Sequence, residues 1–380
     1  MRNPFVYGGV VSGDAFCNRK KELEDLLKAM ENGEKLFVYS ERRFGKTSLV
    51  QVALNKLPKK QYITAYVDLW PTDSDLTFSI ATAKAITESM STSIKKMLAT
   101  AKSFFGRLSP KLTIDEEGKP AISFEPRKSG SLNLELDEVL SAPARISAQD
   151  KKKVVVVFDE FQRILEYESD IIERRLRSII QKQEAVSYIF LGSRKHLIQK
   201  MFLDQSRPLY RAGGHYPLKR IEEKDWLIFI KKKFNNASKR ISYDQIKSIC
   251  QLTEGHPFYT QHLCHVIWEL CEQNNGVTKD LIDYAVQILL TRESYAYTTL
   301  WESLAINQRR FLKGLANEPS NTKYFASEFI LRYGISTASN VQRAVEALLE
   351  KDIIDRENGA FVIVDRFFKI WIQKSQKALS

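Results

Sequence analysis

The chain has 380 residues, of which 43% are hydrophobic and 27% charged. This ordinary globular composition excludes a disordered or fibrous chain, and at about 150 residues per domain the length predicts two or three domains. The longest apolar run near the middle, residues 154–158, is far shorter than the roughly 20 residues that cross a bilayer. The 58 basic and 46 acidic residues give a net charge of +12, which suits an anionic partner or simply a lysine-rich surface.

The N-terminal residues and the cysteines favour a cytoplasmic protein. The opening residues 1–4 are not followed by the apolar segment of a secretory signal. The four cysteines, at positions 17, 250, 264 and 271, are too sparse for a disulfide framework and form no CxxC pair. His262 and His265 have a spacing that can bind a metal, but structural histidines are the more common explanation of it.

Residues 1–220 alternate short β-rich runs with helical stretches, and the runs lie at residues 36–39, 62–67, 154–158, 188–191 and 216–218. Near-continuous apolar strands separated by helices are typical of a parallel sheet covered on both faces. We therefore predict an α/β domain. Between its second and third strands lies an insertion, residues 104–153, in which residues 111–115 and 121–124 flank Glu116, Glu117, Gly118 and Lys119 and predict a hairpin.

Two further domains are expected, at residues 221–295 and 296–380. The first is all helical, with helices at residues 222–235, 243–253, 257–273 and 278–292, and Gly255 and Pro257 are the stop and start signals at one junction.

In the last domain we predict helices at residues 306–315, 323–333 and 337–351, two short strands about Asn358 and Gly359, and an amphipathic stretch at residues 366–377. Apolar residues at positions 341, 345, 348 and 349 form one buried stripe, and Ser336 is the expected N-cap. Three helices followed by a β-hairpin indicate a winged helix-turn-helix.

After the first strand the chain reads Ser40-Glu41-Arg42-Arg43-Phe44-Gly45-Lys46-Thr47-Ser48, and a helix is predicted at residues 47–57. A strand, a loop and a helix in this order are the context of a P-loop, in which main-chain amides and the helix N-terminus hold phosphates. Gly45 lets the main chain approach, Lys46 reaches the β- and γ-phosphate oxygens, and the Thr47 hydroxyl can hold Mg²⁺. The alternative is a chance Gly-Lys-Thr at a helix start.

Ser40 stands where the GxxxxGK[ST] pattern has its first glycine. A serine carries a Cβ, so we expect Ser40 to avoid positive φ.

The third strand ends in Asp159 and Glu160, which is the pattern of a Walker B element. Asp159 would orient Mg²⁺ or its water, and Glu160 would polarise the attacking water. We expect this strand to lie beside the P-loop strand, with its carboxyl end facing the phosphates. Together the two motifs predict ATP or GTP binding, with hydrolysis as a further expectation.

Four polar residues near the ends of the last two strands are weaker candidates. Ser193 and Arg194 follow the fourth strand, where a polar residue could sense the γ-phosphate or orient water; a helix N-cap is the alternative. Arg207 and Arg211 precede the fifth strand, where a cation could neutralise transition-state charge or form an ordinary surface ion pair.

Seven segments carry a resemblance to a known family: residues 16–23, 42–49, 158–162, 192–194, 255–258, 348–354 and 364–371. Over nearly the whole chain, the sequence resembles the archaeal-type ATPases of the STAND branch of the AAA+ proteins. The resemblance implies a P-loop NTPase core, a helical lid over residues 221–295 and a C-terminal winged helix.

The resemblance also implies roles for individual residues. Asn18 and Arg19 would lie against the adenine, and the junction with His256 and Pro257 would place lid residues over the base and the phosphates. Members of the family act as nucleotide switches, in which the γ-phosphate favours one arrangement of the domains. The expected cofactors are ATP and Mg²⁺.

A winged helix suggests DNA binding through its third helix. Its exposed face would offer Thr337, Asn340 and Arg343, with Arg356 on the wing. However, residues 296–380 hold 12 basic and 9 acidic residues, a net of only +3, and a DNA reader usually concentrates more positive charge.

The alternatives to a switch ATPase are therefore an ATP-gated DNA-binding factor of the origin-recognition type and a nucleotide-binding scaffold without turnover. The expected partners are ATP, duplex DNA or a protein at the winged helix, and a second copy of the chain in a nucleotide-dependent self-association, but no membrane.

Overall fold

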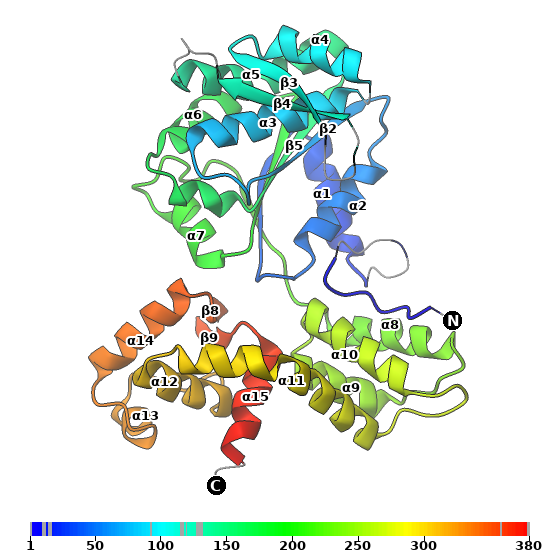
Figure 1. Cartoon of the computed structure of the whole chain (residues 1–380), viewed down its shortest axis with the longest axis vertical. Helices are drawn as coiled ribbons and strands as arrows, with labels where there is room; N and C mark the ends of the chain where they lie inside the picture. The colour runs from blue at the N-terminus through cyan, green and yellow to red at the C-terminus, as the bar shows by residue number, and fades with distance from the viewer. Residues whose placement is uncertain are drawn as a thin grey trace. The chain divides into compact units, whose positions relative to one another are not determined.

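The structure is a computed structural model that describes residues 2–9, 13, 17–91, 93–114, 118, 120–126, 132–357 and 359–377. The chain divides into two compact units (Figure 1). The unit that we call the sheet unit comprises Lys20–Ser40 and Lys46–Leu218. The unit that we call the helical unit comprises Met1–Arg19, Glu41–Gly45 and Lys219–Ser380.

The sheet unit contains a parallel sheet of five strands in the order β2-β5-β6-β1-β7. The strands are β1 (Lys35–Tyr39), β2 (Tyr62–Asp68), β5 (Lys153–Asp159), β6 (Val186–Gly192) and β7 (Gly214–Pro217). After its first residue β5 is buried throughout, and every residue of β6 is buried. Continuous apolar runs form central parallel strands because helices cover both faces of the sheet, and the predicted α/β fold is confirmed.

The helices of the sheet unit are α1 (Lys20–Glu31), α2 (Lys46–Lys56), α3 (Asp75–Met90), α4 (Ile94–Phe104), α5 (Leu132–Asp150), α6 (Ile171–Ile180) and α7 (Lys195–Leu203). A 3-10 helix, η2, spans Phe161–Glu166. Figure 1 shows α1 and α2 together on one side of the sheet, and α3, α5 and α6 on the other.

The insertion after β2 contains the predicted hairpin. Strands β3 (Leu108–Ile114) and β4 (Pro120–Pro126) pair antiparallel in a sheet of their own. Of the predicted turn, Glu116, Glu117 and Lys119 lie outside the described residues.

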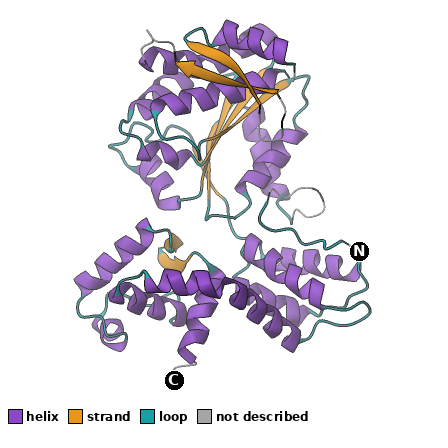
Figure 2. Ribbon diagram, viewed as in Figure 1, coloured by secondary structure: helices purple, strands orange, loops and turns teal. Residues whose placement is uncertain are grey.

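The helical unit begins with α8 (Glu223–Asn235), α9 (Tyr243–Thr253), α10 (Pro257–Leu270) and α11 (Lys279–Glu302). It continues with α12 (Ile306–Asn317), α13 (Ser327–Arg332), α14 (Ala338–Glu350), β8 (Ile354–Glu357), β9 (Ala360–Ile363) and α15 (Arg366–Lys377). Figure 2 shows the strands concentrated in the sheet unit, while helices make up most of the helical unit. The three helices followed by the antiparallel pair β8–β9 form the predicted winged helix.

Three local predictions in this unit were wrong. Helix α11 does not stop at residue 292 but continues to Glu302, because Ala296 and the residues around it continue the helical pattern without a breaker. Helix α13 starts at Ser327 rather than at residue 323. The N-cap of α14 is Thr337, not Ser336: the Thr337 side chain accepts a hydrogen bond from the Asn340 amide, the third residue of the helix.

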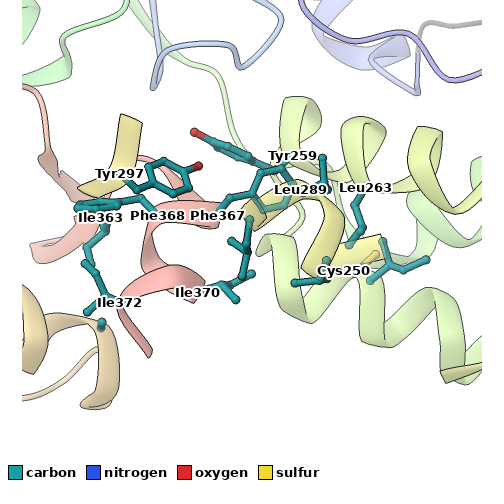
Figure 3. Packing of buried hydrophobic residues seen from close by; sticks show 14 of the residues in the cluster. Cys250, Tyr259, Leu263, Leu289, Tyr297, Ile363, Phe367, Phe368, Ile370 and Ile372 are labelled. Carbon is teal, nitrogen blue, oxygen red and sulfur yellow. The ribbon is translucent and has the colours of Figure 1, made fainter. Parts of the chain in front are cut away.

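One hydrophobic core runs through the helical unit (Figure 3). It joins residues of α9 and α10, such as Cys250, Tyr259 and Leu263, to Phe367 and Phe368 of α15. The rings of Tyr259 and Phe367 pack edge to face with centroids 5.1 Å apart. Because the core is continuous across residue 295, separating the helical part from the winged helix would expose apolar surface to water.

Among the described residues, no helix is both long enough and apolar enough to span a lipid bilayer.

Candidate nucleotide site

The loop between β1 and α2, where the P-loop is predicted, contains left-handed backbone. It turns through two residues with positive φ, Arg43 at 58° and Gly45 at 87°. Ser40 is not among the residues with positive φ, as expected, and its amide donates to the Gly192 carbonyl of β6 at 3.3 Å. A Cβ added at Gly45 would meet nothing within 4 Å, so the positive φ rather than space is what favours glycine there.

Lys46 is held at the mouth of this loop by Ser40. Lys46 is buried, with an exposed fraction of 5%, and its ammonium group donates to the Ser40 carbonyl at 3.2 Å and to the Ser40 hydroxyl at 3.1 Å. A glycine at position 40 would offer only the carbonyl. The departure from the P-loop pattern therefore adds an acceptor for the lysine, and phosphate oxygens could replace both neutral oxygens as stronger, charge-assisted partners.

Thr47 and Asp159 meet at the carboxyl end of the sheet. The Thr47 hydroxyl donates to Asp159 Oδ2 at 2.8 Å, and the Glu160 amide donates to Asp159 Oδ1 at 2.8 Å. The expectation that β5 lies beside the P-loop strand was wrong, because β6 pairs with both and separates them. Thr47 nevertheless reaches Asp159, since it lies in the first turn of α2 rather than on β1.

A residue that the sequence analysis missed completes this cluster. The Tyr66 hydroxyl of β2 also donates to Asp159 Oδ2. Burial and the neighbouring Asp159 carboxylate raise the pKa of Tyr66, so the phenol remains a hydrogen-bond donor at neutral pH. Tyr66 could have been predicted only from the pairing of the strands. Strands β2 and β5 pair in parallel, with Asp68 opposite Asp159 and Tyr66 opposite Val157.

Glu160 is held by two polar side chains. Its backbone is left-handed, with φ 53°, and its Oε2 accepts from the Ser193 hydroxyl at 2.7 Å and from the Gln162 amide nitrogen. The Gln162 amide also donates to Ser193 Oγ at 3.3 Å. The N-cap of α7 is Arg194, without a hydrogen bond from its side chain, so the N-cap alternative applies to Arg194 and not to Ser193. Gln162, two residues beyond Glu160, had been given no role from the sequence.

The arginines proposed to act on the transition state make other contacts in the structure. Arg194 lies 3.4 Å from Glu166, and Arg207 pairs with Glu173, which is buried. The pairing of Arg207 agrees with the alternative of a structural ion pair. Arg211 is exposed, with φ 52°, and its guanidinium lies 5.2 Å from the Tyr210 ring centroid.

The loop residues Glu41–Gly45 belong to the helical unit, and four of their side chains contact it. Their partners are Arg366 for Glu41 at 2.9 Å, Asp352 for Arg42 at 3.3 Å, the Phe258 ring for Arg43 at 4.4 Å and the His256 ring for Phe44 at 4.9 Å. Main-chain amides are the groups by which a P-loop binds phosphate. The contacts that the side chains of Glu41, Arg42, Arg43 and Phe44 make within the helical unit are therefore compatible with phosphate binding by the main chain of this loop.

His256 and Pro257 begin α10. Pro257 occupies its first turn, and His256 Nδ1 accepts a hydrogen bond from the Phe258 amide at 3.3 Å. That bond assigns the ring proton to Nε2, which lies 3.2 Å from the Arg42 carbonyl and donates to it. The other residues assigned to the nucleotide by resemblance lie near the N-terminus: Asn18 is exposed, and the buried Arg19 donates to the Lys219 carbonyl at 2.6 Å.

A buried charge cluster of the helical unit surrounds Arg366, whose side chain is fully buried. Its Nη2 lies 2.9 Å from Glu41 Oε2, its Nε lies 3.0 Å from Glu254 Oε2, and its Nη1 donates to the carbonyls of Ile363 and Val364 at 2.6 and 2.9 Å. Burial alone would raise the pKa of Glu254, but Arg366, Lys369 and Arg220 outweigh it and lower that pKa below its usual value. Arg366 is thus a neutralising cation for two carboxylates.

Replacing this arginine should destabilise the helical unit strongly. We expect Arg366→Met to lower the free energy of unfolding by about 3–5 kcal/mol, because it leaves the Glu41 and Glu254 carboxylates without their buried cation. Urea unfolding followed by tryptophan fluorescence measures the loss, since the tryptophans at positions 226, 268, 301 and 371 all lie in this unit.

The matched control is Arg332→Met. Arg332 also contacts two carboxylates, those of Glu318 at 2.7 Å and Glu328 at 2.6 Å, but its side chain is 53% exposed. Such exposed pairs contribute at most about 1 kcal/mol. Equal losses in the two variants would contradict a special role for the buried cluster.

The described residues offer a metal only a partial set of ligands. No group of three or more His, Cys, Asp or Glu side chains in the described part of the chain could hold an ion. Burial lowers the pKa of His262 to about 4, with smaller effects from His265 and Arg292, and His265 Nδ1 lies 2.8 Å from the Phe5 carbonyl. The Thr47 hydroxyl and the Asp159 carboxylate, hydrogen-bonded to each other, do fit Mg²⁺, which prefers oxygen ligands and takes the remainder from phosphates and water.

A parallel sheet that carries a P-loop, together with a winged helix, defines a P-loop ATPase with a C-terminal winged helix domain. Comparison with family models agrees with this class. Residues 16–263 match the model described as "ATPase domain predominantly from Archaea", and residues 295–374 match that of a "probable winged helix domain". The chain belongs to this archaeal-type family of ATPase domains, and membership supports nucleotide binding.

Solved structures share the fold. The Walker-type ATPase PABY2304 of Pyrococcus abyssi aligns with a TM-score of 0.65 and 17% identity, over 97% of this chain and 99% of that one. The ORC2 protein of Aeropyrum pernix, in its ADPNP–ADP complexes, aligns with a TM-score of 0.54 and 12% identity, over 99% and 98% of the two chains. No curated protein matched the sequence. At these identities the likeness establishes the fold alone.

Proposed function

We propose that the protein is an Mg²⁺-dependent ATPase that acts as a nucleotide-driven conformational switch. The observation that carries the proposal is the hydrogen bond between Thr47 Oγ1 and Asp159 Oδ2, 2.8 Å long, made by the residue that follows the buried Lys46. It supports the proposal because a hydroxyl, a carboxylate and an ammonium group at one end of the sheet are the groups that bind Mg²⁺ and phosphate in P-loop ATPases.

Each group of this edge has a separate task in the proposal. Lys46 leaves its two Ser40 acceptors and binds the β- and γ-phosphate oxygens. Thr47 and Asp159 hold Mg²⁺, Thr47 through its hydroxyl and Asp159 through the water around the metal; the bound ion would neutralise phosphate charge. Glu160 orients and polarises the attacking water, and Ser193 and Gln162 hold its carboxylate in place.

The remaining assignments rest on the resemblance and stay predictions. They are adenine contacts by Asn18 and Arg19, nucleotide contacts by residues 40–48, Ser193, His256 and Pro257, and stabilisation of the transition state by Arg194 and Arg211. The division into a core at 1–220, a lid at 221–295 and a winged helix at 296–380 is likewise a proposal.

A switch requires that nucleotide favour one arrangement of the chain over another. Support comes from the loop Glu41–Gly45, which is continuous with Lys46 and whose Glu41 side chain pairs with the buried Arg366 at the start of α15. A change of loop backbone on phosphate binding would therefore act on a buried ion pair. That gives the γ-phosphate a physical route to bias the conformation.

The test of this function is nucleotide binding by the wild-type protein. Mg²⁺ and ATP should raise its melting temperature, and phosphate should be released in the same buffer. A wild-type protein whose melting temperature does not move with excess Mg²⁺–ATP would refute the proposal.

A second function, ATP-gated binding of duplex DNA, is favoured by the winged helix and by the exposed Arg343 on α14. Arg343 Nη2 donates to Asn340 Oδ1 at 2.5 Å, which pre-orients the guanidinium on the helix surface. Charge argues against a dedicated DNA reader, since Glu346 and Glu350 lie on the same helix and are exposed.

If this second function is right, Arg343→Ala should weaken duplex binding by about 1–3 kcal/mol, roughly 5- to 150-fold, and wild-type affinity should fall with salt. Fluorescence anisotropy with and without ATP measures both. Glu350→Ala on the same helix is the control and should not weaken binding, because it removes a negative charge. Absence of salt-dependent binding would eliminate this function.

A further inference from the structure

Within the described part of the chain, the Asp159 carboxylate accepts three hydrogen bonds, and one of the donors has no place in the P-loop pattern. Thr47 donates to Oδ2 and the Glu160 amide to Oδ1, both at 2.8 Å. The third donor is the Tyr66 hydroxyl, which shares Oδ2 with Thr47. Asp159 is only 8% exposed, so these donors, rather than bulk water, set the orientation of its side chain.

Tyr66 reaches this carboxylate from the edge strand of the sheet. Strands β2 and β5 pair in parallel, with Tyr66 opposite Val157, and the long phenol side chain extends toward the strand ends to meet Asp159. A carboxylate oxygen has two lone pairs and can accept two hydrogen bonds. The Thr47 and Tyr66 hydroxyls therefore satisfy Oδ2, whereas Oδ1, which accepts the Glu160 amide, can accept one more donor such as a water bound to a metal.

We propose that Tyr66 is a positioning residue for the metal: its hydroxyl fixes the Asp159 carboxylate in the orientation that binds hydrated Mg²⁺. The inference rests on the proposed function and adds a residue to it. Partners that orient a metal-binding carboxylate typically contribute 10- to 100-fold in metal affinity. Tyr66 does not touch nucleotide or metal in this proposal; it acts through Asp159.

The test is Tyr66→Phe, which keeps the ring and removes only the hydroxyl. The Mg²⁺ concentration that gives half of the ATP-dependent rise in melting temperature should increase about tenfold. The thermal shift produced by ATP in EDTA, without metal, should stay unchanged. At saturating Mg²⁺ the rate of phosphate release should return to near the wild-type value, because Lys46 and Glu160 are intact.

Tyr62→Phe is the control on the same strand. Tyr62 begins β2 and pairs with Lys153, at the end of the strand remote from Asp159, and it is buried whereas Tyr66 is partly buried. It should leave the Mg²⁺ midpoint at the wild-type value. Direct titration of Mn²⁺, followed by electron paramagnetic resonance in the presence of ADP, should show the same weakening for Tyr66→Phe without relying on turnover.

An unchanged Mg²⁺ midpoint in Tyr66→Phe, in a wild-type background that binds ATP, would overturn this inference and leave the proposed function standing. A second result would also overturn it. If Tyr66→Phe has a lower nucleotide-free melting temperature than Tyr62→Phe but keeps the wild-type Mg²⁺ midpoint, Tyr66 contributes only to stability and not to metal binding. A wild-type protein that binds no nucleotide at all would instead refute the proposed function.

Discussion

Lys46→Ala should abolish the stabilisation of the protein by ATP. A ligand present at 100 times its dissociation constant stabilises by about 2.7 kcal/mol, which in a domain of 150–250 residues raises the melting temperature by roughly 5–10 °C. Lys46 makes the charge-assisted contacts to the phosphates, and losing them should weaken binding at least about 100-fold. At the same ATP concentration the remaining stabilisation is then about 0.4 kcal/mol, and the shift is about 2 °C or less.

Each shift is measured against the variant's own nucleotide-free melting temperature, because Lys46 is buried and its hydrogen bonds to Ser40 contribute to stability. Lys56→Ala is the control, since Lys56 is the exposed last residue of the same helix. It should keep the full ATP-dependent shift. A full shift in Lys46→Ala would mean that this loop does not bind the phosphates.

Glu160→Gln should separate binding from hydrolysis. The substitution retains the size of the side chain and an oxygen that accepts from Ser193, so the local network can persist. It removes the negative charge that polarises water, and loss of such a group costs about 10²- to 10⁴-fold in rate. Phosphate release should fall by that factor in single-turnover measurements, while the ATP-dependent thermal shift remains.

The control for this variant is Glu166→Gln, which neutralises a half-exposed carboxylate paired with Arg163 and Arg194. We expect its rate of phosphate release to stay within about twofold of the wild-type rate. If Glu160→Gln releases phosphate as fast as the wild type, Glu160 is not catalytic. If neither the wild type nor Glu160→Gln releases phosphate faster than the background rate, the protein is a nucleotide-binding scaffold without turnover.

The same Glu160→Gln variant is suited to finding the partner. With Mg²⁺–ATP bound and not hydrolysed, the chain should accumulate in its nucleotide-bound conformation. Co-purified material can then be tested for duplex DNA and for protein. Recovery of nucleic acid that disappears with Arg343→Ala would favour the DNA-binding function, and recovery of a protein alone would favour a switch with a protein partner.

The sequence by itself determined the features that lie in contiguous segments. The apolar strand β5 followed by Asp159, and the loop from Ser40 to Thr47, each carry their chemistry within about ten residues. Their hydrophobic periodicity and the glycine at a left-handed position are local properties. The winged helix was also predictable, because its three helices and two strands follow one another along the chain.

Only the tertiary structure decided which side chains complete the site. Sheet order placed β6 between β1 and β5. It brought Tyr66 of β2 to Asp159, and Ser193, the residue that follows β6, to Glu160. In the helical unit, folding buried Arg366 against Glu41, more than 300 residues away in the chain. Such partners leave no local pattern, because they are selected by strand pairing and by the need to neutralise buried charge rather than by spacing along the sequence.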